Sequence, residues 1–479
     1  MRPIRVCIRV ELNLVLRMGG RVHPPNAVCS VSGPRSSVLR KHLNCRPRAC
    51  KGTHKRFTRQ FNSDNRPEQP HLTRMNRRHF VQVSLAALAS TQLGTVAALG
   101  QPVPPEAPKP GSPLITAPTP DGVVIVWPVD VPSTGWVEYG ETEALGNVAR
   151  GAVDGLRPYD GRAIFVTLTG LRGGARVFYR TVTVPVNFPN HYKMTRGTAM
   201  VSPTYSFTLP GPGPTAKVAI WNDTHQQPDT LPAVQELTEE FAPDLLVWNG
   251  DVVADQFMAE NDLVNSFLRP GNGVEPASIR PMLFVRGNHD TRGAVARHLP
   301  GYVPKPLTNG YQNLLRVGPV GIIVLDTGED KEGPQYYADL GEWANYRQAQ
   351  KVWLESAIKH PLFKSAPHKI VCCHIPLRWK QPDEAGAWCP DGDERWSPLL
   401  ARGRVQAVFS GHTHQFWHSA PTATRPYHQI IGGGPQTKST NWSPTPATVV
   451  KLEADKKTLS VEVVEARSRS QLLSLKLKS

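Results

Sequence analysis

The sequence has no long apolar run and few cysteines, and both absences restrict what the protein can be. No stretch reaches the roughly 18 uninterrupted apolar residues of a membrane-spanning helix, which excludes a multi-span membrane protein. Of the seven cysteines, four lie within residues 1–74, and only Cys372, Cys373 and Cys389 follow. Because an odd number with two adjacent members makes no disulfide framework, we interpret the adjacent pair as small buried hydrophobic residues.

Acidic residues are scarce in the first part of the chain. Residues 1–74 hold 16 Lys/Arg but only 3 Asp/Glu, so most of the formal net charge of +16 arises there. The segment has no sustained helical or strand period, which predicts an unstructured basic segment. One interpretation is a nucleic-acid-binding arm, and the other is a sequence that is absent from the working protein. We favour the second because a recognisable segment begins at Met75.

Residues 75–100 are similar to a twin-arginine export signal. Arg77 and Arg78 precede a moderately apolar stretch, and small residues lie ahead of a plausible cut near Gly100. The alternative is a short amphipathic or buried helix. Export would place the protein in the periplasm or outside the cell, with no membrane span in the mature chain and no stable nucleic-acid partner. Five prolines then mark residues 101–112 as an extended linker.

Two patterns of strands follow the linker. Short alternating runs separated by turn residues predict a small all-β sandwich domain over residues 113–209. Over residues 215–465, buried-type strands alternate with helical stretches, which predicts an α/β domain whose last runs form a meander. We expect its strands at 217–221, 244–248, 282–286, 320–325, 369–373 and 405–409, its helices at 229–241 and 341–359, and the meander at 427–432, 446–453 and 458–464.

Ionisable residues follow five of these strands at the point where each strand ends. In open α/β sheets, ligands gather at the carboxyl ends of the strands. Glycine accompanies three of the groups, and a glycine after a strand lets the backbone approach whatever the next side chain holds. A single histidine after a strand more often has a structural role. Five consecutive strand ends that carry such residues favour a functional site. The residues are Asp223 and His225; Asp251; Asn288 and His289; His374; and His412 and His414.

In order and spacing these motifs resemble the calcineurin-like metallophosphoesterase superfamily over about residues 215–435. The resemblance implies a sheet sandwich flanked by helices, with two metal ions that share Asp251. It implies one ion held by Asp223, His225, Asp251 and His414, and a second held by Asp251, Asn288, His374 and His412. Divalent or mixed-valence Fe, Mn, Zn or Co would suit these ligands.

The same resemblance implies hydrolysis of a phosphate mono- or diester by water activated to hydroxide between two metals. His289 occupies the family's position for protonating the leaving group, and we expect Asp290 to orient it. The expected substrate is a small phosphate ester, with nucleotides among the candidates. The alternatives are a non-catalytic binding protein of the same fold and a nucleic-acid-associated phosphodiesterase that uses residues 1–74.

The strands over 113–209 resemble a fibronectin type III-like domain of the kind that precedes the catalytic domain in purple acid phosphatases. The likeness rests on the Trp127 strand, Val137–Gly140, Leu168–Leu171 and Tyr179–Arg180. Those phosphatases place a tyrosine ligand three residues after the shared Asp, where this chain has Ala254. We therefore expect no tyrosine ligand. Arg292 is either a phosphate contact or a surface arginine, and residues 376–398 are either a substrate-facing or a packed loop.

Overall fold

The structure, a computed structural model, describes residues 107–306, 310–331, 333–380 and 388–479. Residues 1–74, residues 75–100 and the first half of the linker lie outside these ranges, so the expectations for them stay predictions. The chain divides into two units, Met1–Gly94 and Thr95–Ser479, and every described residue belongs to the second. Within the described ranges, no helix is both long and apolar enough to cross a bilayer.

Two sheets form the centre of the α/β part. The larger has nine strands in the order β22-β21-β20-β11-β12-β13-β1-β2-β6, and the smaller has six in the order β14-β15-β16-β17-β19-β18. Runs of Val, Ile and Leu make the central parallel strands buried on both faces, as parallel sheets require. The strands of the α/β part that precede its last hairpins are β11 (Ala216–Asn222), β12 (Leu245–Asn249), β13 (Met282–Val285), β14 (Asn313–Val317), β15 (Val320–Val324), β16 (His368–Cys372), β17 (Ala407–Ser410), β18 (Trp417–Ser419) and β19 (His428–Ile431).

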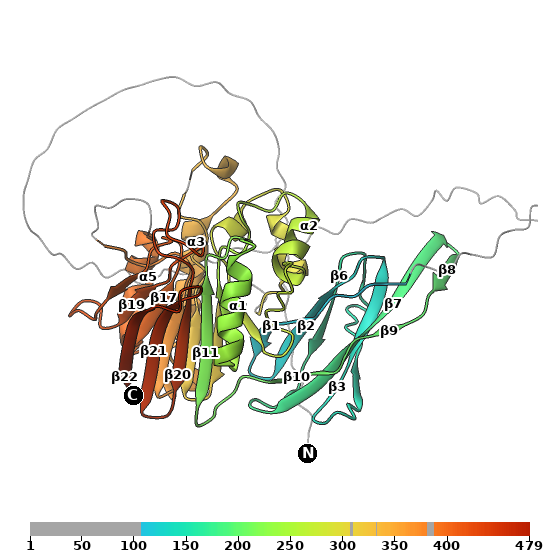
Figure 1. Cartoon of the computed structure of the whole chain (residues 1–479), viewed down its shortest axis with the longest axis horizontal. Helices are drawn as coiled ribbons and strands as arrows, with labels where there is room; N and C mark the ends of the chain where they lie inside the picture. Colours follow the sequence, from blue (N-terminus) through green and yellow to red (C-terminus); the bar gives the residue numbers. More distant parts are fainter. Residues whose placement is uncertain (1–106, 307–309, 332, 381–387) are drawn as a thin grey trace, which may run out of the picture. The chain divides into compact units, whose positions relative to one another are not determined.

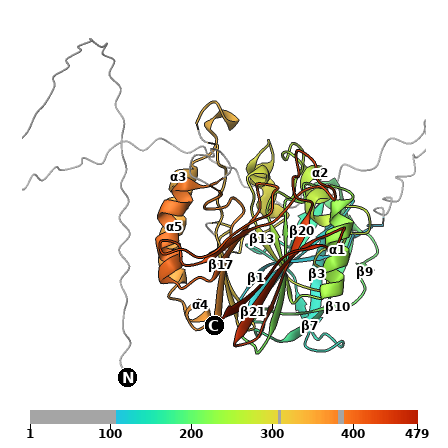
Figure 2. The same cartoon turned by 60° about the vertical axis from the view of Figure 1, so that its left-hand side comes forward.

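The two sheets pack face to face, and helices cover their outer faces (Figure 2). Leu231 and Leu237 of α1 pack with Trp221 and Trp248 on the larger sheet, whereas Trp396 of α5 packs on the smaller one. This arrangement confirms the predicted α/β sandwich of sheets flanked by helices. The helices are α1 (Thr230–Phe241), α2 (Glu260–Leu263), α3 (Trp343–Ala357), α4 (Pro361–Lys364) and α5 (Pro390–Arg402), with short turns η1 (Val264–Leu268), η2 (His289–Thr291), η3 (Ala296–Gly301) and η4 (Tyr337–Asp339).

The chain ends in a meander as expected, but the expected strand at 427–432 is not part of it. That strand, β19, pairs parallel with β17 in the smaller sheet. β20 (Thr448–Ala454), β21 (Thr458–Glu465) and β22 (Gln471–Lys478) pair antiparallel in sequence order. β20 pairs antiparallel with β11, so the meander extends the larger sheet. The α/β part therefore continues past residue 465. Helix α5 begins at Pro390, inside the range 376–398 where the sequence suggested a loop, and its Trp396 is buried.

Residues 114–208 form two sheets that pack around Trp127, Val137 and Tyr179. One sheet contains β1, β2 and β6, and the other is built on β3 and the long β7 (Figure 1). The strands are β1 (Leu114–Thr119), β2 (Gly122–Pro128), β3 (Ser133–Gly140), β4 (Asn147–Ala149), β5 (Tyr159–Asp160), β6 (Ala163–Leu168), β7 (Arg176–Asn190), β8 (Lys193–Arg196), β9 (Met200–Val201) and β10 (Tyr205–Thr208). The fibronectin likeness stays a prediction.

The sheet of β1, β2 and β6 is continuous with the larger sheet of the α/β part. β1 pairs parallel with β13 through Thr116 and Met282, and Asn313 donates a hydrogen bond to the Pro118 carbonyl. The sequence did not indicate this pairing, because strand patterns carry no information on which distant strands are neighbours. The two parts are therefore joined by backbone hydrogen bonds and not only by a linker.

Removal of one buried hydrogen bond tests how much this junction contributes to stability. The Tyr179 hydroxyl of β7 donates to the Ser278 carbonyl at 2.7 Å, and both residues are buried. Tyr179→Phe removes the donor and leaves the carbonyl unpaired, so we expect the free energy of unfolding to fall by about 1 to 2 kcal/mol. Urea denaturation measures the change. Tyr192→Phe, on a side chain that is 84% exposed, should leave stability unchanged; equal effects of the two substitutions would contradict the prediction.

Candidate metal centre

The five groups of candidate residues meet at the carboxyl ends of the parallel strands. Asp223 comes directly after β11, and Asp251 lies two residues after β12, its parallel neighbour. His374 lies two residues after β16, and His412 two residues after β17. The inner faces of the two sheets pack together, so the loops of both sheets reach one region. The positions expected from the strand pattern are thus brought together.

The ligand atoms gather in two groups that share one carboxylate. Asp223, His225, Asp251 and His414 form the first, and their ligand atoms lie within 4.8 Å of one another. The second group consists of Asp251, His374 and His412 within the same distance. Asp251 belongs to both, as the sequence resemblance implied. The grouping is that of a two-ion site, while the role of each residue as a ligand stays a prediction.

The histidines of the first group turn their unprotonated nitrogens toward each other. His225 Nδ1 lies 2.9 Å from the Ala254 carbonyl, and His414 Nδ1 lies 2.9 Å from the Trp442 carbonyl. A carbonyl only accepts, so each Nδ1 carries the hydrogen and each Nε2 keeps its lone pair. The two Nε2 atoms are 3.1 Å apart. Two acceptors at this separation fit a shared positive charge and do not fit a direct hydrogen bond.

His374 follows the same pattern in the second group. Its Nδ1 lies 2.8 Å from the Asn249 carbonyl, which assigns the hydrogen to that nitrogen. Its Nε2 is 3.1 Å from Asp251 Oδ2 and 3.8 Å from Asp223 Oδ1. All three histidines therefore direct Nε2 at two buried carboxylates, and in the neutral ring this nitrogen is an acceptor that a cation can use. The donor set fits metal ions, which bind imidazole nitrogen and carboxylate oxygen together.

Asn288 completes the second group. One terminal atom of its amide is 3.3 Å from Asp251 Oδ2, 3.2 Å from His374 Nε2 and 3.0 Å from His412 Nδ1, and the other is 2.6 Å from Arg292 Nη2. The first position faces ligand atoms only. It suits the amide oxygen when a cation lies among those atoms, and the amide NH2 otherwise. The residue is thus placed where the resemblance implied a ligand.

The electrostatics of the buried pair also favour positive charge. Burial raises the pKa of Asp223 to about 8, against the opposing effect of His374 and with a further rise from Asp251. Burial would lower the pKa of His374, but the carboxylates of Asp251 and Asp223 raise it to about 10. A positive charge is therefore stabilised between these two carboxylates. A metal ion satisfies the same requirement.

Three glycines leave room for the carboxylates and His374, as the motif pattern predicted. A Cβ on Gly250 would lie 2.4 Å from His374 Nδ1, and one on Gly287 would lie 2.2 Å from Asp251 Oδ1. A Cβ on Gly411 would lie 2.2 Å from Asp223 Oδ2. No other residue type fits these positions without displacing a candidate ligand.

Several candidate ligands have left-handed backbone conformations. Asp223, His225, Asp251, His412 and His414 have φ between 45° and 69°. Such conformations are uncommon outside glycine and cost roughly 1–3 kcal/mol each. They persist only where the surroundings fix them, and they are concentrated at functional sites.

Asp290 has a different role from the one expected. Its carboxylate accepts hydrogen bonds from the backbone N–H groups of Gly287, Asp251 and Val252, at 2.9, 3.0 and 3.1 Å. The prediction that it orients His289 is therefore wrong, because its oxygens are used to hold two turns together. Among the described residues, His289 Nδ1 is buried without a hydrogen-bond partner.

His289 lies at the edge of the site. Its Nε2 is 3.9 Å from Asp251 Oδ2, and its side chain is 22% exposed. Burial lowers the pKa of His289 to about 4, which Asp251 opposes and His225 reinforces. The imidazole is therefore neutral near pH 7, and in this form it offers one N–H for hydrogen bonding.

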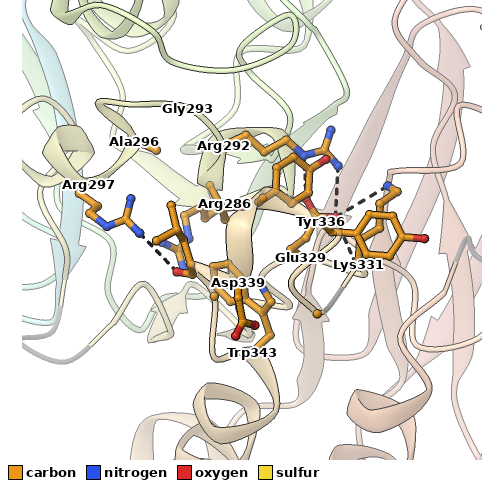
Figure 3. Close-up of a pocket in the computed structure, with 15 residues that line it drawn as sticks. Arg286, Arg292, Gly293, Ala296, Arg297, Glu329, Lys331, Tyr336, Asp339 and Trp343 are labelled. Carbon is orange, nitrogen blue, oxygen red and sulfur yellow. Dashed lines mark hydrogen bonds and ion pairs between the residues drawn. The ribbon is translucent and has the colours of Figure 1, made fainter.

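Three further residues, Asp330, Glu329 and Trp442, lie around the candidate ligands. The sequence did not indicate a role for any of them. Asp330 Oδ2 lies 3.4 Å from His412 Nε2, after the end of β15. Glu329 accepts from Arg292 at 2.7 and 3.1 Å (Figure 3), so Arg292 is no surface arginine. The Trp442 ring packs edge-on against His225 and His414. Asp330 follows β15 and Trp442 follows β19, so their positions after strands could have indicated them. No sequence motif accompanies either residue.

Residues 216–416 match the family described as Calcineurin-like phosphoesterase. A serine/threonine-protein phosphatase CPPED1 from Danio rerio is 30% identical over 138 residues, and the Mus musculus protein of the same name is 28% identical. The match spans 28% of this chain and 42% of each relative. This chain therefore spans less than half the length of those relatives.

Two solved structures resemble a larger share of the chain. A purple acid phosphatase, PPD1, from yellow lupin (Lupinus luteus) seeds has a TM-score of 0.56 at 17% identity, with 77% of this chain and 74% of that chain covered. The structure of PhoD has a TM-score of 0.51 at 13% identity, with 77% and 88% covered. At these identities the similarity concerns the fold.

The shared position of Asp251 predicts how metal content responds to substitution. Protein purified without chelator should hold about two ions per chain by elemental analysis. Asp251→Asn, which tolerates the left-handed backbone, should lose most of both, whereas His225→Ala should lose mainly one. Asp154→Asn, on an exposed turn, is the matched control. A metal content in Asp251→Asn equal to that of the unsubstituted protein would refute the shared ligand.

Proposed function

We propose that the protein is a metal-dependent hydrolase of phosphate mono- or diesters, because residues 216–416 match the calcineurin-like phosphoesterase family. The observation that carries the proposal is the direction of the imidazole nitrogens of His225, His374 and His414, which face two buried carboxylates. Cations bound there would polarise the phosphate and lower the pKa of water. Fe, Mn, Zn and Co all suit the mixed nitrogen and oxygen donors.

The side chains of this protein orient the reactants. Backbone carbonyls fix the rings of His225, His374 and His414, and the Asp290 carboxylate fixes the two turns that carry Asp251 and Asn288. In hydrolysis the water oxygen bonds to phosphorus, and the ester oxygen leaves with the electrons of its bond. No side chain needs to form a covalent intermediate.

His289 is proposed to assist the leaving oxygen. It lies beside Asp251 and is partly exposed, so a bound ester can reach it. The imidazole can donate a hydrogen bond to the ester oxygen, and its protonated form passes a proton to that oxygen as the bond breaks and returns to the neutral ring. This assistance matters most for a poor leaving group, because an activated phenolate leaves without a proton.

Leaving-group dependence tests this role. We expect His289→Ala to lower kcat for an alkyl phosphate by about 100-fold or more and for 4-nitrophenyl phosphate by much less. Steady-state kinetics with both esters measures the difference. His191→Ala, an exposed histidine of the sandwich, should leave both rates unchanged. Equal losses for the two esters in His289→Ala would remove His289 from the protonation step.

We also propose that the working protein is exported. The support is the sequence pattern of residues 75–100, in which Arg77 and Arg78 precede an apolar stretch and small residues. A protein cut near residue 100 would lose nearly all of the excess positive charge. The basic segment would then have no part in the function.

Mass spectrometry of the protein from its native host tests the export proposal. We expect an amino terminus near residue 101 in the fraction outside the cytoplasm. Replacement of both Arg77 and Arg78 with Lys should leave the protein uncut in the cytoplasm, because the paired arginines address it. Arg66→Lys is the matched control. A secreted protein that still carries residues 1–74 would contradict the proposal.

A further inference from the structure

A pocket of about 180 Å³ opens beside the second ligand group. Arg292 connects the pocket to the second ligand group. It lines the pocket, and its Nη2 lies 2.6 Å from the Asn288 amide. Glu329 also lines the pocket, and the next residue, Asp330, contacts His412. Pockets for whole drug-sized ligands measure roughly 300–1,000 Å³, so this one suits part of a ligand, such as a single ring.

Three aromatic side chains line the pocket. Tyr336 and Tyr337 are 44% and 42% exposed, and Trp343 lines the pocket with them (Figure 3). Among the described residues from 216 onward, the only exposed large aromatic side chains are these two tyrosines and Trp442, which packs on His225 and His414. Trp442 lies at the first ligand group, whereas the two tyrosines line the pocket beside the second. Neighbouring tyrosine rings that are open to solvent suggest a ligand that covers them.

The cations of the pocket are mostly neutralised. Arg292 pairs with Glu329, and Arg286 pairs with Asp326 at 2.9 Å. Each guanidinium also lies over a ring, Arg292 at 5.0 Å from Tyr337 and Arg286 at 5.6 Å from Trp343. Paired guanidinium groups that lie against rings present flat surfaces more than free charge. Of the four cations, only Arg297 has no carboxylate within ion-pair distance among the described residues.

The wall that carries the tyrosines has an unusual backbone. Tyr337, Ala338 and Asp339 have consecutive positive φ values of 49°, 52° and 57°. The chain turns there so that Tyr336, Tyr337 and Asp339 all line the pocket. Left-handed conformations outside glycine are uncommon, and they are concentrated at functional sites.

From these observations we propose that the pocket binds a flat aromatic or heteroaromatic ring in the leaving group of the substrate. The ring lies against Tyr337, with Tyr336 and the Arg292 guanidinium beside it, while the phosphate occupies the metal centre. The inference rests on the proposed phosphoesterase function and specifies its substrate class. Aryl phosphates and nucleotides share this chemistry, since one carries its ring on the phosphate and the other carries it as a base.

Matched ester pairs test the proposal in the metal-loaded full-length protein. Phenyl phosphate is compared with hexafluoroisopropyl phosphate, whose leaving alcohol has similar acidity but no ring, and adenosine 5′-phosphate is compared with ribose 5-phosphate. We expect kcat/KM to favour the ring-containing ester of at least one pair by about tenfold. The pair that shows the preference identifies the source of the ring. Equal values within both pairs overturn the proposal.

Substitutions show which side chain contacts the aromatic ring of the substrate. Tyr337→Ala should remove the preference, and Tyr337→Phe should keep it, because only the flat ring is required. If Tyr337→Ala lowers both esters of a pair equally, the residue acts through Arg292 and the proposal fails. If Trp442→Ala removes the preference and Tyr337→Ala does not, the ring lies on the other side of the site and the proposal is wrong. Tyr192→Ala, in the sandwich, is the matched control.

The outcomes also separate this inference from the proposed function. If the metal-loaded protein cleaves none of the four monoesters and not bis-4-nitrophenyl phosphate, the phosphoesterase function itself fails. If it cleaves esters with and without a ring equally well, only the pocket inference fails.

Discussion

The burial of two carboxylates, Asp223 and Asp251, is the constraint on which the rest of the site depends. Neither is more than 1% exposed, and both belong to the group of ligand atoms that includes His225 and His414. Two like charges removed from water are strongly unfavourable unless positive charge accompanies them. The surrounding structure is therefore organised to hold cations. The left-handed turns, the glycines without side chains and the carbonyls that fix the imidazoles all serve that requirement.

Side-chain hydrogen bonds around the site connect the loops that carry the candidate ligands. Asp290 ties the turn after β12 to the turn after β13, so Asp251 and Asn288 cannot move independently. Arg292 continues the connection to Glu329 on the loop after β15. The contacts thus run from the larger sheet to the smaller one across the centre. A site that must bring five loops together needs such links, because each loop alone is free to shift.

The strand pattern predicted most of the α/β fold and the positions of all eight candidate site residues. It succeeded because parallel strands are buried on both faces and because their carboxyl ends lie at one edge. It could not predict the direction of the Asp290 carboxylate, since orientation depends on which N–H groups the folded turns leave unpaired. Asp330 and Trp442 also follow strands, but each is an isolated residue without a motif. The pairing of β1 with β13 links positions far apart in sequence and has no local signature.

That pairing makes the sandwich a structural part of the α/β region. A shortened protein beginning near residue 210 would lose β1 and leave the N–H and C=O groups of β13 facing water along an uncovered edge. Such edges recruit strands from other molecules and promote aggregation. Met282, which is fully buried, would lose its neighbour Thr116 at the same edge. Domain shuffling in evolution would meet the same obstacle, so we expect the two parts to have been inherited as one piece.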